Sequence, residues 1–326
     1  MPATDLVTGI TRLPAIVMAR LLRQDPSHGQ DPFSDHRRDH ARGMESRPGF
    51  PLSGAVPSTI SGVALAASLM LGLSPAHAAT CRDPRGFEAF LDDMKHEASA
   101  QGISSSTIAS ALDNVSYDPS IVSKDHGQHV FRQSFEQFSG RMVSSYRLHK
   151  GAALIKQYAG VFNRIEQQFG VPAPIIVAIW GLETDFGAVN GNTPTFRALA
   201  TLAFDCRRSP MFQSELIDAL RVVQRGDLPP SAMRGAWAGE IGQTQFMPSS
   251  YYKFAVDFSG NGRRDLIHDV PDVLASTANF LSSYGWKRGA GWAPGQPNFP
   301  VIKEWNKADV YSRTIAYFAT RLNGGD

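Results

Sequence analysis

The chain has few cysteines, almost no net charge and no apolar run long enough to cross a bilayer. Its 326 residues include two cysteines and give a formal net charge of +2 at pH 7. This balance gives no electrostatic reason to expect a nucleic-acid partner. The apolar run at 63–73 is too short for a transmembrane helix, which needs about 20 residues. A hydrophobic content of 42% is nevertheless ample for a globular core.

The first 78 residues have the features of an export signal. The run at 63–73 has the length of a signal-peptide hydrophobic region, and a small-x-small motif ending at Ala78 follows it. We expect cleavage after Ala78; a short buried helix is the alternative for the apolar run. Signal peptides are usually about 15–30 residues long. We therefore expect either that translation starts at Met44, with Arg47 as the positive charge, or that residues 1–43 are a disordered extension.

Both cysteines, Cys81 and Cys206, lie in the part of the chain that remains after the expected cleavage. Thr80 is too bulky for a lipid-attachment motif before Cys81, so we expect a soluble periplasmic protein without a stable membrane anchor. An oxidising compartment favours a disulfide between the two cysteines. Two free buried thiols are the alternative.

Residues 79–326 predict one mainly α domain. Apolar residues recur at helical spacing, and Gly or Pro marks many segment ends. Strand signals are sparse and favour short pairs near 254–258 and 300–302. No Pro- or Ser-rich linker divides residues 82–326. Besides the stretch described next, the predicted helices cover 87–98, 103–112, 152–169, 212–224, 272–284 and 308–322.

Glu183 stands in the middle of an apolar helical stretch. Pro172 suits the start of this helix and Gly187 suits its end. Spacings of three and four place Ile176, Ile179 and Glu183 on one face, which is otherwise apolar. Burial disfavours the charged form of a carboxyl group and raises its pKa, which suits general-acid catalysis. A structural Glu that caps or pairs with an Arg is the alternative.

A second informative segment, 238–251, reads AGEIGQTQFMPSSY. Its glycines allow the backbone to approach a ligand closely. Its amide side chains both donate and accept hydrogen bonds, which suits sugar hydroxyl and acetamido groups. Gln245 is the candidate for such a contact. A capped structural loop ahead of a helix starting at Pro248 would show the same pattern.

Residues 257–265 (DFSGNGRRD) have the pattern of the first half of an EF-hand calcium loop. Oxygen-bearing side chains stand at positions 1, 3, 5 and 9, and Gly262 stands at position 6. His268 occupies position 12, where a bidentate Glu is usual, so we expect Asp272 to close the site, with Asp269 as the runner-up. Na⁺ or a metal-free loop of Asx turns is the alternative to Ca²⁺. The candidate ligands are Asp257, Ser259, Asn261, the main chain of Arg263, and Asp272.

In combination, these segments resemble the soluble and membrane-bound lytic transglycosylase B family of murein-cleaving enzymes. The resemblance covers about residues 85–324. It implies that residues 79–326 form a lysozyme-like, mainly α (α+β) catalytic domain with small β embellishments and a calcium-type loop. The motifs that carry it are GLETDFG at 181–187, ALATL at 198–202, GEIGQTQFMPSSY at 239–251, VDFSGNG at 256–262 and ASTAN at 275–279.

The resemblance implies cleavage of the β-1,4 bond between N-acetylmuramic acid (MurNAc) and N-acetylglucosamine (GlcNAc) without water, leaving a 1,6-anhydro end. Glu183 would be the sole catalytic carboxylate, acting first as acid and then as base. Asp185 should point elsewhere, although two-carboxylate glycosidases need a second acid. Peptidoglycan strands are the implied partner, the chemistry needs no cofactor, and we expect a monomer. The alternatives are a hydrolytic muramidase and a non-catalytic scaffold that binds peptidoglycan or calcium.

The resemblance also implies a set of substrate-binding positions. Arg207 and Arg208 would meet stem-peptide carboxylates, for which Arg suits bidentate contact; a surface ion pair is the alternative. Phe280 and Trp305 stand where the family commonly has Tyr, and we expect them to keep stacking on sugar faces. The full set is Gln245, Arg207, Arg208, Asn306, Tyr311, Phe280 and Trp305.

Overall fold

The computed structural model describes residues 79–127 and 133–325. The expected signal segment and the start at Met44 lie outside the described residues. Cleavage after Ala78 is not tested by the structure. All three stay predictions. Within the described ranges, no helix combines the length and the apolar character that a membrane span requires.

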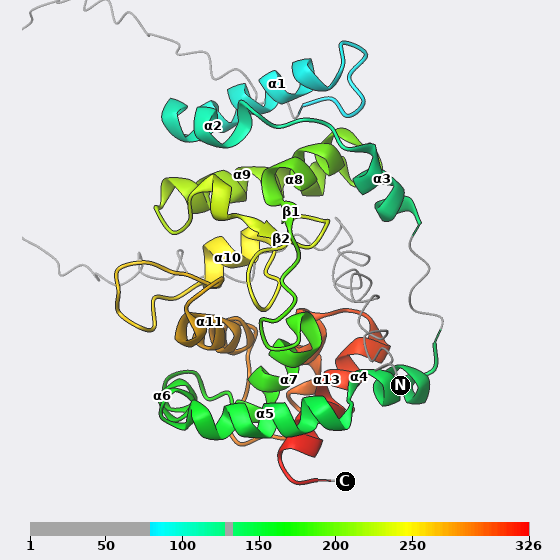
Figure 1. The fold of residues 1–326 in the computed structure, drawn as a ribbon, viewed down its shortest axis with the longest axis vertical. Coiled ribbons are helices and arrows are strands. Elements are labelled where there is room, and N and C mark those ends of the chain that lie inside the picture. Colours follow the sequence, from blue (N-terminus) through cyan, green and yellow to red (C-terminus); the bar gives the residue numbers. More distant parts are fainter. Residues whose placement is uncertain (1–78, 128–132, 326) are drawn as a thin grey trace, which may run out of the picture. The chain divides into compact units, whose positions relative to one another are not determined.

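The described residues are mainly helical (Figure 1). Long segments with apolar residues at helical spacing form most of the helices where the sequence predicts them. The α-helices are α1 (Phe87–Ala100), α2 (Ser105–Leu112), α3 (Pro119–His126), α4 (Phe135–Met142), α5 (Ser145–Gln157), α6 (Ala159–Phe169), α7 (Ala173–Thr184), α8 (Thr195–Phe204), α9 (Ser209–Gln224), α10 (Pro248–Phe254), α11 (Val270–Ser283), α12 (Phe299–Trp305) and α13 (Asp309–Leu322).

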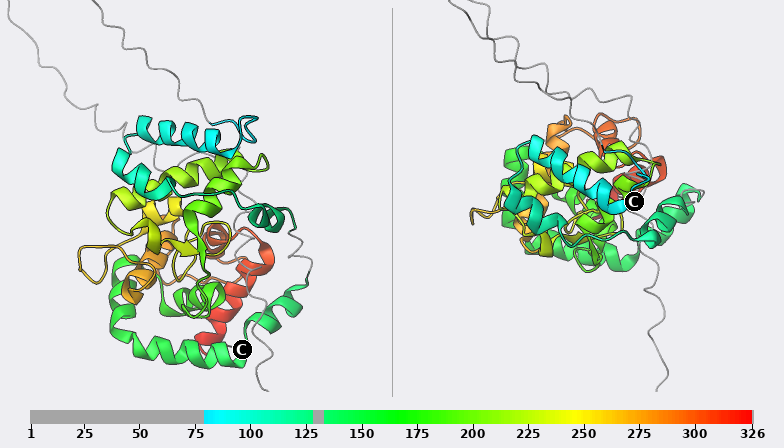
Figure 2. Two further views of the ribbon diagram at one scale, coloured as in Figure 1. Left: turned by 45° about the horizontal axis from the view of Figure 1, so that its top comes forward. Right: turned by 90° about the horizontal axis from the view of Figure 1, so that it is seen from above.

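Helix α7 is the core helix. All its residues are buried, including Glu183 and Thr184. Helices α5, α11 and α13 pack against it, and the left view of Figure 2 shows α13 (red) beside green helices. Fully burying an aliphatic side chain contributes about 1.5–3 kcal/mol, and Ile175, Ile176 and Ile179 are all 0% exposed. The position of Glu183 is therefore set by the packing of the core.

The strands are short and do not lie where the sequence predicts them. β1 (Thr193–Pro194) pairs antiparallel with β2 (Arg234–Gly235), in the register Thr193 to Gly235. The strands predicted near 254–258 and 300–302 are wrong, because the first segment leaves the end of α10 and the second lies inside α12. Pro300 occupies a first-turn position, where its missing N–H is tolerated, and an apolar run this short fits either structure.

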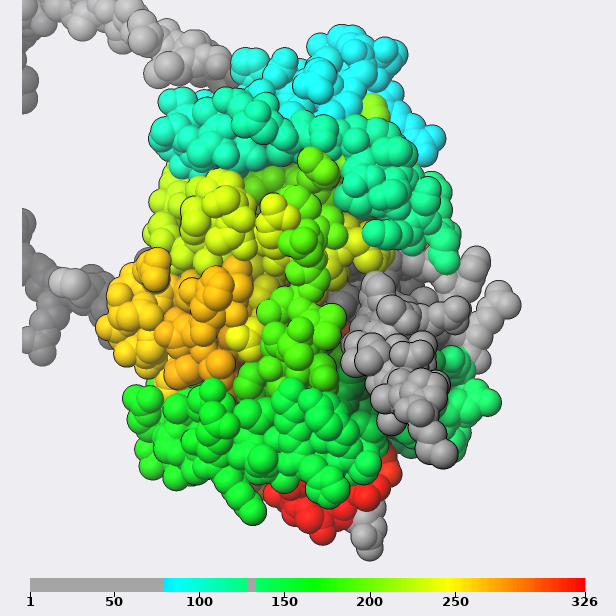
Figure 3. Space-filling view, in the orientation of Figure 1, coloured from blue at the N-terminus to red at the C-terminus, as the bar shows by residue number. Residues whose placement is uncertain are grey.

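The segment between α7 and α8 comes to the surface. Figure 3 shows it in green on the near face, between the α8–α10 region and α5, and Val189 within it is 41% exposed. This segment leaves the buried end of α7 after Thr184, one residue beyond Glu183. The chain thus reaches the surface within a few residues of the candidate acid.

The N-terminal segment is tied to the α8–α9 connection. Cys81 and Cys206 form a disulfide, which is the pairing that the compartment argument favours. The Arg82 N–H donates to the Phe204 carbonyl at 2.8 Å, and the Gln213 amide donates to the Ala79 carbonyl at 2.7 Å. The disulfide joins residues 125 apart in sequence, so it should restrict the unfolded chain considerably.

We therefore predict that Cys81→Ser combined with Cys206→Ser lowers the free energy of unfolding by about 2–5 kcal/mol. Denaturant unfolding followed by circular dichroism measures this change. Wild-type protein treated with reductant should lose the same amount. An unchanged midpoint in both samples would contradict a stabilising role for the disulfide.

Candidate active site

Glu183 lies in the last turn of α7 and is 9% exposed. Its Oε1 accepts a hydrogen bond of 2.9 Å from Nε1 of Trp305, the last residue of α12. Trp305 is 0% exposed, and an indole can only donate. The indole therefore holds the carboxyl group in one orientation from the buried side.

Trp305 is itself fixed by an aromatic cluster. Its ring lies edge-on to Phe280 at 5.0 Å and to Phe246 at 5.3 Å between centroids. Such pairs contribute about 0.5–1.5 kcal/mol each beyond burial. Phe280 is 2% exposed and also packs on Phe254. Phe280 and Trp305 thus contact other aromatic rings of the core, and Trp305 also supports Glu183. The sugar contacts implied for both residues stay predictions.

The turn after Glu183 adopts an unusual backbone. Asp185, Phe186 and Gly187 have φ values of 53°, 61° and 80°, a left-handed conformation that costs roughly 1–2 kcal/mol for a residue with a side chain. Arg147 of α5 pairs with the Asp185 carboxylate at 3.2 Å, and Lys150 donates to the Asp185 carbonyl at 3.4 Å. The Asp185 side chain is thus directed to α5, as expected for a residue without a catalytic role.

Gln245 also has a left-handed backbone, with φ of 52°, and is 2% exposed. Its amide nitrogen donates to the carbonyls of Asn190 at 3.1 Å and Gly242 at 2.7 Å. These bonds tie the glycine-rich loop to the segment that follows α7. The sugar contact implied for Gln245 is consequently not made by its N–H groups in this conformation, and its binding role stays a prediction.

Arg207 and Arg208 form ion pairs inside the protein. Both contact the Asp125 carboxylate, which is 1% exposed, and the Arg207 pair measures 2.8 Å. Arg207 is the more accessible, at 35% side-chain exposure against 16% for Arg208. Within the protein, both arginines therefore form ion pairs, which is the kind of contact given as the alternative to stem-peptide binding. Their contact with stem peptides stays a prediction, and Arg207 is the better placed of the two.

Asp205 extends this cluster through contacts with Arg82 and His126. Asp125, His126 and Asp205 offer ligand atoms within 4.8 Å of one another. Arginine side chains already neutralise both carboxylates, so we assign no metal ion to this group.

Asn306 and Tyr311 flank the start of α13. They are 1% and 0% exposed, and the Asn306 Oδ1 accepts from the Ala308 N–H at 3.0 Å. The Tyr311 ring lies 6.2 Å from that of Phe138. These contacts are with the protein's own chain, and the substrate contacts implied for both residues stay predictions.

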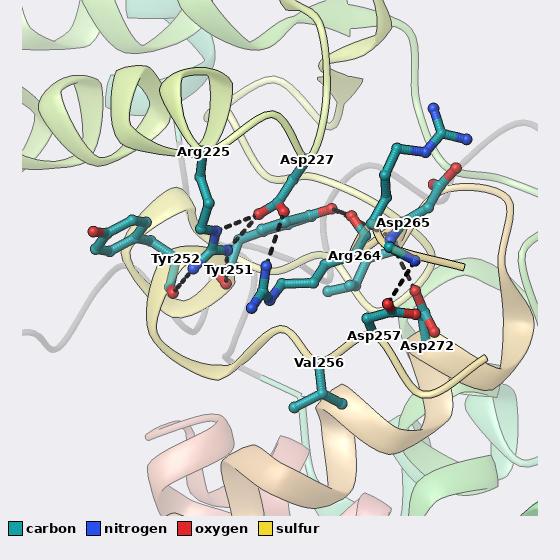
Figure 4. Close-up of polar contacts among 12 residues, drawn as sticks. Arg225, Asp227, Tyr251, Tyr252, Val256, Asp257, Arg264, Asp265 and Asp272 are labelled. Atoms are coloured by element: carbon teal, nitrogen blue, oxygen red, sulfur yellow. Dashed lines mark hydrogen bonds and ion pairs between the residues drawn. The ribbon is translucent and has the colours of Figure 1, made fainter. Parts of the chain in front are cut away.

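The calcium-type loop brings two acidic side chains together (Figure 4). Asp257 accepts from the N–H groups of residues 260, 261 and 262 at 2.8–3.0 Å, and Asp272 accepts from those of 258, 259 and 265 at 2.8–3.1 Å. Burial raises the pKa of Asp272, and the nearby Asp269 adds to this. Burial also acts to raise the pKa of Asp257, but its three N–H donors leave the net pKa below the ordinary value.

The loop fits a hard cation such as Ca²⁺. Asp257, Ser259, Asn261, Asp272 and the carbonyl of residue 263 provide an all-oxygen donor set, which this ion prefers. A carboxylate has about four acceptor sites, so three N–H bonds leave capacity on each acid. Asp269 caps α11 through the Asp272 N–H, which makes it the weaker choice of closing ligand.

A second set of contacts in Figure 4 anchors the loop to α9 and α10. Asp227 pairs with Arg225 at 2.5 Å and with Arg264 at 3.3 Å. The Tyr251 hydroxyl donates to the Arg264 carbonyl at 2.5 Å. Desolvation raises the pKa of this phenol, so it remains a hydrogen-bond donor at all ordinary pH values. The loop is therefore fixed at its end by contacts that need no metal.

The chain belongs to the transglycosylase SLT domain family, whose model matches residues 86–295. It is similar to the membrane-bound lytic murein transglycosylase B of Escherichia coli K12, with 39% identity over 170 residues, which cover 50% of this chain and 47% of the relative. The match thus spans about half the length of that relative. The family recognised from the sequence motifs is confirmed.

Solved structures confirm the lysozyme-like, mainly α fold class. SltB3 of Pseudomonas aeruginosa, in complex with NAG-NAM-pentapeptide, matches with a TM-score of 0.70 and 29% identity over 74% of this chain and 80% of that chain. The Escherichia coli lytic transglycosylase Slt35 in complex with calcium matches with a TM-score of 0.63 and 27% identity, over 73% and 92% of the two chains.

Trp305 and Arg147 are contacts of the site that the sequence did not reveal in these roles. The family resemblance implied a sugar contact for Trp305, and none of the sequence motifs includes Arg147. Both lie far from Glu183 in sequence, and no local pattern links them to it. Only the packing of α12 and α5 around the end of α7 brings them there.

From the indole contact we predict that Trp305→Phe lowers kcat on peptidoglycan by about tenfold, because a misplaced catalytic group costs that much or more. Trp286→Phe is the matched control: Trp286 is buried, but its Nε1 has no hydrogen-bond partner among the residues that the structure describes. Muropeptide release followed by chromatography measures both rates. Equal rates for the two variants would contradict the role of the indole.

For the loop we predict that millimolar Ca²⁺, added after chelation, raises the thermal midpoint, because a ligand that binds only the folded state stabilises it. Each kcal/mol gained corresponds to about 2–4 °C for a domain of this size. Asp272→Asn should abolish the increase, whereas Asp309→Asn, at the exposed start of α13, should keep it. If Ca²⁺ leaves the thermal midpoint of the wild type unchanged, the loop does not bind calcium.

Proposed function

We propose that this protein is an exported lytic transglycosylase that cleaves the MurNAc-β-1,4-GlcNAc bond of peptidoglycan and leaves a 1,6-anhydroMurNAc end. The observation that carries this proposal is the buried carboxyl group of Glu183, held by the Trp305 indole at the C-terminal end of the core helix. Asp185, the acid two residues further on, forms an ion pair with Arg147. This arrangement supports chemistry through one carboxyl group.

In the first step Glu183 acts as general acid. The Trp305 indole donates to Oε1, which favours placing the acid proton on Oε2. Glu183 transfers this proton to the glycosidic oxygen, and the bond from that oxygen to C1 of MurNAc breaks with its electron pair on the oxygen. The GlcNAc residue leaves as an alcohol. Positive charge develops at C1, and the acetamido group of MurNAc stabilises it.

In the second step the same residue acts as base. Glu183, now a carboxylate, takes the proton of the MurNAc C6 hydroxyl while that oxygen bonds to C1. The anhydro ring forms, and Glu183 returns to its protonated state. No water is consumed. A low exposed fraction serves both steps, because it limits the access of water and therefore competing hydrolysis.

Several similarities support the substrate. One related structure, SltB3, is described as bound to NAG-NAM-pentapeptide and another as bound to NAG-anhNAM-pentapeptide. The related Escherichia coli enzyme is named a lytic murein transglycosylase. We extend this substrate class to the present chain, with Gln245 near the scissile bond and Arg207 toward stem-peptide carboxylates.

Location and metal complete the proposal. The signal-like segment ending at Ala78 supports export to the periplasm, where the disulfide can form. Ca²⁺ would be held by Asp257, Ser259, Asn261, Asp272 and the carbonyl of residue 263. When bound, it would neutralise the two acids and brace the loop. It would take no part in bond cleavage.

We predict that Glu183→Gln abolishes release of anhydro-muropeptides from purified peptidoglycan while the variant still binds it. Glutamine keeps the shape of the side chain but can neither give nor take the proton. Mass spectrometry of the products, with wild type in parallel, measures the outcome. Full activity in the variant would overturn the assignment of Glu183.

The same digest separates the alternatives. Reducing ends from the wild type would indicate a muramidase that uses water. Binding without cleavage by both proteins would indicate a scaffold.

A further inference from the structure

Gln243 uses every polar group it has to join three parts of the molecule. Its side-chain Oε1 accepts from the Trp180 indole at 2.9 Å, and its carbonyl accepts from the Thr184 hydroxyl at 2.5 Å. Its side-chain Nε2 donates to the Ile267 carbonyl at 2.9 Å, and its main-chain N–H donates to the Leu266 carbonyl at 2.8 Å. The residue is 8% exposed, so each of these bonds would be costly to lose.

The two bonds to α7 bracket the candidate acid. Trp180 and Thr184 are four residues apart and share one face of the helix, and Glu183 lies between them in sequence. Contacts at two successive turns of one face fix both the rotation and the axial position of this helix end. The direction in which Glu183 projects is set by the same two quantities.

The turn after α7 closes onto the same residue. The Gly187 N–H donates to the Thr184 hydroxyl at 2.9 Å. A Cβ at Gly187 would lie 2.3 Å from the Gln243 Oε1, so only glycine lets the turn come this close. The left-handed turn and the glutamine side chain are thus packed directly against each other.

On its other side Gln243 is anchored to a rigid segment. Leu266 is 0% exposed, and a Cβ at Gly242 would lie 2.3 Å from the Leu266 carbonyl oxygen. The Ile267 N–H donates to the Asp265 carboxylate at 2.9 Å. This segment directly follows the calcium-type loop. Gln243 therefore links the C-terminal end of α7 to segment 265–267, so the position of that segment helps to fix the position of the helix end.

We propose that Gln243 is a positioning residue for Glu183. It holds the C-terminal turn of α7 in register with segment 265–267, so that the Glu183 carboxyl group stays aligned with the reacting oxygen. This inference rests on the proposed function of Glu183.

The test is Gln243→Met in the full chain, which keeps the size of the side chain but removes both of its amide contacts. With a soluble tetrasaccharide of alternating GlcNAc and MurNAc as substrate, kcat should fall by about tenfold or more, because a displacement near 1 Å can cost that much. The KM should stay within about twofold of the wild-type value, since no substrate contact is removed.

Gln213→Met is the matched control. Gln213 is also 8% exposed, and its amide makes two internal hydrogen bonds, to Ala79 and Ser209. It lies on α9, outside the contacts of α7. Both variants should lower the thermal midpoint, but only Gln243→Met should lower kcat.

A second measurement follows the contact itself. The indole N–H signal of Trp180 in a ¹⁵N-labelled sample, identified by its loss in Trp180→Phe, should shift in Gln243→Met and stay in place in Gln213→Met. A merely structural role would lower kcat in proportion to lost stability in both variants.

The outcomes distinguish this inference from the proposed function. If Glu183→Gln is inactive but Gln243→Met keeps the wild-type kcat, or if the two Met variants lose kcat equally, the positioning role is wrong. If Glu183→Gln itself remains active, the proposed function fails first.

Discussion

The structure depends on one constraint: an acidic residue has to be held at the end of a helix that is otherwise entirely core. Helix α7 buries all its residues, and Glu183 is among them. A carboxyl group there must be hydrogen-bonded to be tolerated, and the Trp305 indole supplies one such bond. The aromatic cluster around Trp305 then fixes the donor. The contacts that pack the core around Trp305 therefore also hold the candidate catalytic group in place.

The left-handed turn after α7 shows how the surrounding elements maintain this arrangement. Asp185 and Phe186 adopt a backbone conformation that is unfavourable for residues with side chains. Arg147 and Lys150 hold the turn from α5, and Gln243 holds it from the glycine-rich loop. Strain of this kind persists only where neighbours over-determine it. Here the neighbours come from two separate elements, α5 and the glycine-rich loop.

The sequence predicted the family, the buried position of Glu183 and several of the longer helices, because these depend on periodicity and on local motifs. It predicted one helix over 152–169, where α5 ends at Gln157 and α6 begins at Ala159. It failed for the strands, because short apolar runs such as 300–302 do not distinguish strand from helix. It did not reveal the burial of Phe280 and Trp305, which depends on the packing of α11 and α12 against each other. Contacts such as Trp180 with Gln243 join segments more than sixty residues apart, and no local pattern encodes them.

The central claim is that Glu183 completes the reaction without water, and digestion in ¹⁸O-labelled water tests it most directly. The account predicts muropeptides with 1,6-anhydroMurNAc ends that carry no ¹⁸O, since the new bond to C1 comes from the C6 hydroxyl of the same sugar. Products with reducing ends that contain one ¹⁸O atom at C1 would contradict it, because they require water as the nucleophile.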